Sequence, residues 1–159
     1  MNVPETVGVW VHALSTVIMF GFYGVLGRIV VPALERSVSG PSLGAAVAGI
    51  ARRALPFMIL SIIAFTISGA YLLVIDEEFA GLGNFRGSTW NTLMLVKHGL
   101  VAVMVVGAGL VHVLAGRLAE PDRTDEERRE GLTWLRLAAE GTTALGALIL
   151  LLTAAAQVG

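Results

Sequence analysis

The stretch of residues 90–117 places the strongest limit on what this chain can fold into. After Lys97 it carries no formally charged side chain until its last residue, and roughly 20 apolar residues in a helix cross the hydrocarbon core of a bilayer. The same stretch nevertheless contains Lys97, His98 and His112. Ionisable groups at membrane depth are costly and usually face the protein interior or a cavity. The stretch therefore predicts a membrane-spanning helix with three candidate functional side chains.

The composition extends this interpretation to the whole chain. Of its 159 residues 55% are hydrophobic and 14% charged, and the mean hydropathy is +0.78. Soluble domains are less apolar and more highly charged, and segments of alternating polarity, as in membrane barrels, are missing from the sequence. We therefore predict an all-α integral membrane protein, with 1–159 forming a single transmembrane domain.

Four uncharged runs predict four spans with short connections. The spans are expected at about residues 7–31, 54–75, 90–116 and 134–157, and the first and third connections at 32–53 and 117–133. Residues 37–49 are rich in Gly, Ser and Ala, which indicates a loop containing at most a short helical turn. Thr124 and Glu127 have the spacing of a helix-capping box.

Basic residues indicate how the spans are oriented. The first and third connections are rich in arginine, whereas the second contains one, Arg86, and the segment before the first span contains none. Loops rich in Lys and Arg remain in the cytoplasm. The basic residues in or flanking the first and third connections are Arg28, Arg36, Arg52, Arg53, Arg117, Arg123, Arg128, Arg129 and Arg136. The expected architecture is a four-transmembrane-helix bundle with both termini extracytoplasmic.

In this orientation His12 and His98 lie at nearly equal depth, close to the outer ends of the first and third spans. His112 is 14 residues beyond His98, or about 21 Å along a helix, so the two cannot share one mononuclear site. Paired imidazoles from two helices suit a bis-histidine haem b or a copper ion. Met94, one helical turn before His98, could add a soft thioether ligand.

Two further basic side chains each have a functional and a structural interpretation. Lys97 points about 100° away from His98; it could hold a haem propionate or another anion, or reach outward to the acidic residues at 76–78. His112 lies near the inner side at a depth similar to Met58. These two residues could form a second metal or haem site, or His112 could simply bond to a carbonyl or water.

The sequence also excludes several classes of protein. It has no cysteine, which excludes disulfides, iron–sulfur clusters and thiolate metal sites. Outside the membrane flanks it has no basic patch of the kind that binds nucleic acid.

Several short motifs resemble the copper resistance D family. They are WVHALS in the first span, the arginine pair at 52–53, SGAYLL, STWNTLMLVKHGLV and LRLAAEGTTALGALILLLTA. The resemblance implies copper uptake or tolerance at the bacterial inner membrane, often beside a periplasmic copper-binding protein. It also implies that His12, Lys97 and Arg53 are the positions that matter.

The arrangement of spans and polar residues in this chain is similar to that of a second family, the small membrane-bound protoporphyrinogen oxidases of bacteria. These four-helix proteins are thought to hold haem b, and they too have a histidine early in the first span and a lysine in the third. The GFYGVLG stretch of this chain departs from their aromatic and Leu-Pro-Arg continuation.

The leading hypothesis is a multi-pass inner-membrane protein that binds or transports copper through His12, His98 and Met94 and is not an enzyme by itself. Transfer across the membrane would need further ligands inward, and the candidates are Met19, Met104, Met58 and His112. One alternative is a haem b cytochrome, ligated by His12 and His98, for electron transfer or porphyrin redox chemistry. Another is an accessory subunit of a larger complex. The expected partners are the lipid bilayer, a periplasmic copper-binding or electron-transfer protein, and a second copy of the chain.

Overall fold

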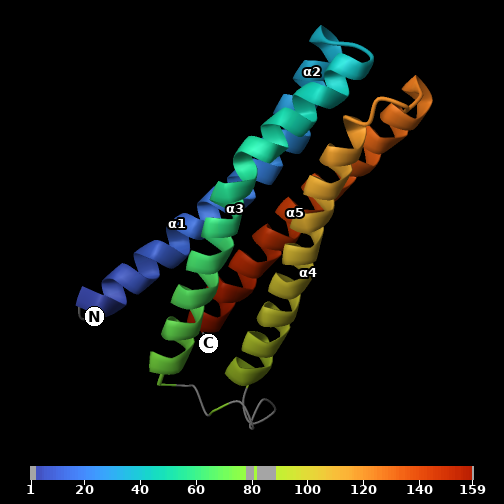
Figure 1. Ribbon diagram of the computed structural model, residues 1–159. Helices are drawn as coiled ribbons and strands as arrows, with labels where there is room; N and C mark the ends of the chain where they lie inside the picture. The colour runs from blue at the N-terminus through green and yellow to red at the C-terminus, as the bar shows by residue number, and fades with distance from the viewer. Residues whose placement is uncertain (1–2, 78–80, 82–88, 159) are drawn as a thin grey trace.

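The computed structural model describes residues 3–77, 81 and 89–158, and within them the secondary structure is helical, with no strand (Figure 1). The elements are α1 (Val3–Val25), a π-helical segment η1 (Leu26–Val30), α2 (Val31–Ser37), α3 (Pro41–Ile75), α4 (Thr89–Leu118) and α5 (Asp125–Val158). The first three follow one another without a break. Glu78 and Arg86, which entered the predictions above, lie outside the described residues.

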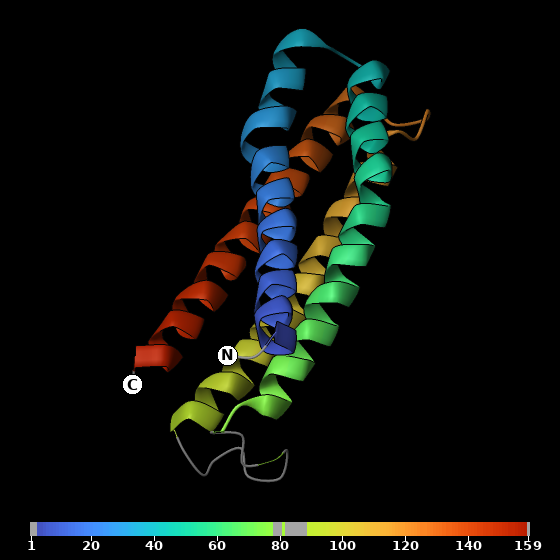
Figure 2. The same cartoon turned by 90° about the vertical axis from the view of Figure 1, so that its left-hand side faces the viewer.

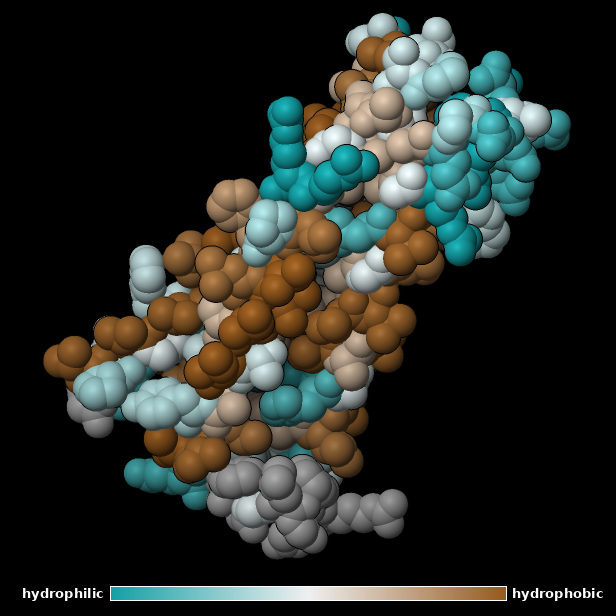
Figure 3. Space-filling model, in the orientation of Figure 1, coloured by the Kyte–Doolittle hydropathy of each residue, from teal (hydrophilic) through white to brown (hydrophobic). Residues whose placement is uncertain are grey.

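The described residues contain four helical stretches long and apolar enough to cross a membrane: Val3–Ser37, Pro41–Ile75, Trp90–Leu118 and Asp125–Ala154. This confirms the expected class of structure. Large apolar side chains also point outward, among them Val17, Phe57, Val106 and Leu151. Figure 3 shows such residues across the middle of one face, with hydrophilic residues gathered near the α4–α5 connection. An apolar exterior of this kind suits a lipid environment.

Each long helix packs along two others. α1 contacts α3 and α5, and α4 contacts α3 and α5. Figures 1 and 2 show both chain termini at the end of the molecule where α3 finishes and α4 begins, which we call the termini end. The opposite end, the turn end, holds the α2–α3 and α4–α5 connections. The sidedness of these ends in a membrane stays a prediction.

The buried residues of each long helix recur at intervals of three and four, the spacing of helices that pack at shallow angles. On α4 they are Met104, Ala108, Val111, Ala115 and Leu118. Similar series run along α1 into η1, along α3 and along α5: Thr16, Met19, Tyr23 and Leu26; Met58, Ser61, Phe65 and Ser68; Leu132, Leu135, Ala139 and Thr142. This register determines which candidate residues face inward.

The expected loop at 37–49 is wrong, because α3 begins at Pro41. The connection from α2 is short and contains Gly40, whose φ of 61° is a conformation that glycine adopts readily. Beyond it, Leu43, Val47 and Ala51 are buried at helical spacing, so the Ala-rich segment combines good helix propensity with an inward apolar face. Its small residues had suggested a loop, whereas they serve close helix packing.

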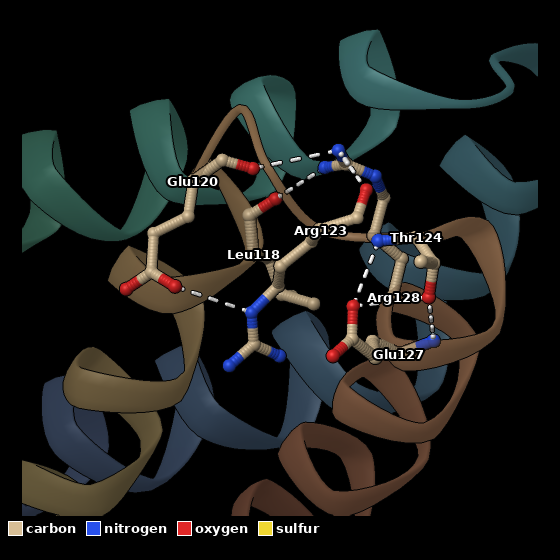
Figure 4. A network of polar contacts seen from close by, with 6 residues as sticks. All are labelled: Leu118, Glu120, Arg123, Thr124, Glu127 and Arg128. Atoms are coloured by element: carbon tan, nitrogen blue, oxygen red, sulfur yellow. Dashed lines mark hydrogen bonds and ion pairs between the residues drawn. The ribbon is translucent and has the colours of Figure 1, made fainter.

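The α4–α5 connection contains the predicted capping box (Figure 4). The backbone N–H and hydroxyl of Thr124 donate to Glu127 Oε2 over 2.8 and 3.0 Å. The backbone N–H of Glu127 donates to Thr124 Oγ1 over 3.3 Å. The reciprocal bonds satisfy donors at the start of α5 that lack partners within the helix, which confirms the prediction.

These bonds lead to a testable pH dependence. The backbone N–H and then the hydroxyl of Thr124 lower the pKa of the Glu127 carboxyl below its ordinary value. A carboxyl with a lowered pKa stabilises the fold above its unfolded pKa of about 4.3, and this contribution disappears as the pH falls through the folded pKa. Glu127→Gln should therefore lower the melting temperature slightly at pH 7 in detergent, and the difference from the parent should vanish in acid. A difference that persists unchanged to pH 3 would contradict this account; Glu126→Gln is the control.

Arg128, next to the capping box, closes the end of α4. Its side chain is buried, and its guanidinium donates to the carbonyls of Leu118 over 2.9 Å, Arg123 over 2.9 Å and Glu120 over 3.4 Å (Figure 4). The last carbonyls of a helix have no partner within it. The Arg128 side chain therefore ties the start of α5 to the end of α4.

Candidate metal centre

His12 lies between α1 and α3 at the termini end. Its ring stacks on Phe65 with the centroids 4.3 Å apart and an interplanar angle of 25°. Its Nδ1 lies 3.2 Å from the Phe65 carbonyl oxygen and 3.2 Å from Ser68 Oγ. Thr16, one turn further along α1, donates to the His12 carbonyl over 2.7 Å. The imidazole is thus held against α3 by stacking and by polar contacts.

These contacts determine which ring nitrogen of His12 carries the proton. A carbonyl oxygen can only accept, so Nδ1 must be the donor to Phe65. Ser68 directs its own hydroxyl hydrogen to the Ala64 carbonyl over 2.6 Å, which leaves its oxygen to accept from His12. In neutral imidazole the other nitrogen, Nε2, then has the free lone pair. Metal-binding histidines are commonly oriented in this way, with the nitrogen that does not bind the metal donating to a backbone carbonyl.

The surrounding residues on α3 were not singled out by the reasoning from sequence. A Cβ at Gly69 would lie 3.0 Å from His12 Cε1, so the glycine makes room for the ring. Ser68 supplies the hydrogen-bond acceptor. Both belong to the SGAYLL motif, which was the available signal, since small and hydroxylated residues in a membrane helix often mark a helix contact.

Lys97 belongs to the inward face of α4. It lies seven residues before Met104, which is buried, and residues seven apart share one helix face. Lys97 interacts electrostatically with His12 of α1 and with Asp76 at the end of α3. Asp76 is one of the acidic residues expected as its partners. The structure therefore brings His12 and Lys97 together at the termini end.

His98 occupies a different face of α4 from Lys97. Its side chain is exposed, and its Nδ1 donates to the carbonyl of Met94, one turn earlier, over 2.6 Å. This bond leaves Nε2 of His98 with the free lone pair, as in His12. The charges of His98 and His12 interact, whereas the hydrogen bonds of His12 go to α3. Metal ligation by His98 and the half-buried Met94 stays a prediction.

His112 lies in an aromatic environment further along α4. Its ring centroid is 6.1 Å from that of Phe22, nearly parallel, and 6.1 Å from that of Tyr23, edge-on. Its Nε2 is buried and has no hydrogen-bond partner among the residues that the structure describes. Met58, its expected co-ligand, is buried in the same core cluster as Tyr23.

Arg53 is not part of the arrangement around His12. It is exposed on α3 and precedes Ser68 by 15 residues, which is about 22 Å along the helix. Within the described parts of the chain, no group of three or more His, Asp or Glu side chains could hold a metal ion. A metal centre at His12 must therefore use few such ligands or include sulfur.

The fold and these polar groups define a multi-pass helical membrane protein with a half-buried histidine and lysine, His12 and Lys97, at its termini end. A model of the copper resistance protein D family matches residues 48–156. The chain belongs to this family, which confirms the first resemblance, and the comparisons give no support to the oxidase resemblance. The match includes Lys97, His98 and His112 but begins after His12. No curated protein and no solved structure matches the chain.

Proposed function

We propose that this protein binds copper at His12 and takes part in copper passage across the bacterial inner membrane. The observation that carries the proposal is the orientation of the His12 ring, whose Nδ1 is held by the Phe65 carbonyl so that Nε2 is free to ligate. Membership of the copper resistance protein D family identifies copper as the metal to test.

His98 and Met94 are the proposed additional ligands. Both lie on α4, His98 has its Nε2 lone pair free, and it lies close enough to His12 for the two rings to interact electrostatically. His98 is exposed, so its ring can turn without displacing packed neighbours. Imidazole suits either oxidation state of copper, and thioether favours Cu(I).

The proposed orientation places the termini end outside the cytoplasm. The turn end carries Arg36, Arg52, Arg117 and Arg129, which suits the cytoplasmic side. The His12 site would then face the compartment from which copper arrives, within reach of a periplasmic copper-binding protein.

The proposal is tested by loading the purified protein with Cu(II) in mild detergent and measuring bound metal after dialysis. One equivalent should bind, and His12→Ala should lower the affinity at least about 100-fold, because it removes the central ligand. His112→Ala removes a histidine of α4 toward the turn end and is the matched control, which should retain Cu(II). Equal binding by the parent and His12→Ala would refute the proposal.

Lys97 provides a second test, in which the substitution should raise the affinity for copper rather than lower it. Its positive charge interacts with His12 and should oppose a cation bound there. Lys97→Leu, which removes the charge and adds no metal ligand, should raise the Cu(II) affinity roughly tenfold. Lys97→Arg keeps the charge and should leave the affinity close to that of the parent. An unchanged or weaker affinity in Lys97→Leu would show that Lys97 does not oppose metal binding.

The structure does not favour haem b at this site. His12 of α1 lies against α3, with its Nδ1 3.2 Å from the Phe65 carbonyl oxygen and 3.2 Å from Ser68 Oγ. The His12 ring is in stacking contact with Phe65 on one face. A bis-histidine haem would require these helices to separate.

A further inference from the structure

We infer that Met19 and Met104 form a second copper site, specific for Cu(I) and deeper in the membrane than His12. The inference rests on the proposed function, since it assigns the next ligands along the path of the metal. It requires no redox step, because copper is supplied and passed on as Cu(I).

The two methionines lie directly inward of the outer site. Met19 follows His12 by seven residues on α1, and Met104 follows Lys97 by seven on α4, which is two turns or about 10.5 Å on each helix. Each methionine side chain is only 2% exposed, and both belong to one buried cluster. A copper ion leaving His12 along the inward faces of these helices would reach them next.

Met19 and Met104 line the same small cavity. Its volume is about 10 Å³ and its exposed lining is apolar, so it is large enough for roughly one water-sized particle but offers a water molecule few partners. The other lining residues are Phe20, Tyr23, Ile62, Val105 and Ala108. A dry space of this size suits a single bare metal ion.

The chemistry of the lining selects the oxidation state of the ion. Thioethers are soft ligands that favour Cu(I) over harder divalent ions. Methionine often fills irregular gaps in a core because its side chain is flexible. At this position two methionines from different helices border a gap that neither fills. Ligation explains both the pairing and the remaining space.

A route continues from the cavity toward the turn end. Tyr23 lines the cavity, and its ring lies edge-on to that of His112. His112 is one turn beyond Ala108, another lining residue, and its buried Nε2 has no partner among the described residues. A buried nitrogen without a partner is costly, and accepting Cu(I) from the methionines would provide one. His12, the methionine pair and His112 thus form a series of ligands along the molecule.

The test is to titrate the purified protein in detergent with Cu(I) delivered from its bicinchoninate complex. The parent should bind two equivalents, with sulfur scattering in the copper X-ray absorption spectrum. Met19→Leu/Met104→Leu, a nearly volume-conserving change, should lose one equivalent and the sulfur scattering of this site, leaving at most the contribution of Met94, while the remaining equivalent still depends on His12. Ala108→Leu should also lose the second equivalent, because it fills the cavity while keeping both thioethers.

Met58→Leu is the matched control, since Met58 is buried on α3 but does not line the cavity. It should retain both equivalents. Two equivalents in the double leucine variant, or a loss in Met58→Leu, would overturn the methionine site while leaving the proposed function intact. A parent that binds no copper, or binds it independently of His12, would overturn the proposed function itself.

Discussion

Gly44→Ala is expected to destabilise the protein by roughly 2–3 kcal/mol. A Cβ at this position would overlap the backbone carbonyl of Leu118 and lie 3.3 Å from Arg128 Nη1. Since the nearest atoms belong to backbone rather than to a flexible side chain, α3 and α4 would have to separate. Thermal unfolding in mild detergent measures the effect.

Gly49→Ala is the matched control for this change. It lies on the same helix five residues further on, and a Cβ there would meet nothing within 4 Å. Alanine is favoured over glycine in a helix by roughly 0.5–1 kcal/mol, so Gly49→Ala should stabilise. If both substitutions changed the stability in the same direction, the close α3–α4 contact at Gly44 would be refuted.

Arg128→Ala is expected to cost about 3 kcal/mol. The substitution removes three hydrogen bonds to carbonyls at the end of α4 and in the following turn, and it leaves the Leu118 carbonyl in a site that water reaches poorly. Hydrogen bonds from a charged donor contribute more than neutral ones. The measurement is the melting temperature together with the protease sensitivity of the α4–α5 connection.

Two variants distinguish this capping role from a general effect of charge. Arg129→Ala removes an exposed arginine next in sequence and should change stability little. Arg128→Lys keeps the charge but cannot reach three carbonyls at once, so it should recover only part of the loss. Full recovery with lysine would show that charge, rather than hydrogen-bond geometry, holds the connection together.

Features that depend on short sequence distances were predictable. The Thr124–Glu127 capping box is a contact between residues three apart, and the long apolar helices follow from composition over windows of about 20 residues. The α2–α3 connection was misjudged because Gly, Ser and Ala are common both in loops and at close helix contacts. The burial of Leu43, Val47 and Ala51 resolves that ambiguity.

The environment of His12 depends on which helices are neighbours, and local sequence does not determine this. Equal depth along the helices predicts that His12 faces α4, whereas its ring bonds to Phe65 and Ser68 of α3. Helix geometry separates Lys97 and His98 by about 100° around the helix axis. It does not determine which of the two side chains faces inward. The seven-residue series from Lys97 through Met104 to Val111 was the signal that could have indicated the inward face.

The central claim is that Nε2 of His12 binds copper, and the most direct measurement is pulsed electron paramagnetic resonance of the Cu(II)-loaded protein. The account predicts the nitrogen modulation of a coordinated imidazole, present in the parent and in His112→Ala and lost in His12→Ala. Bound Cu(II) without imidazole modulation, or modulation that persists in His12→Ala, would contradict it.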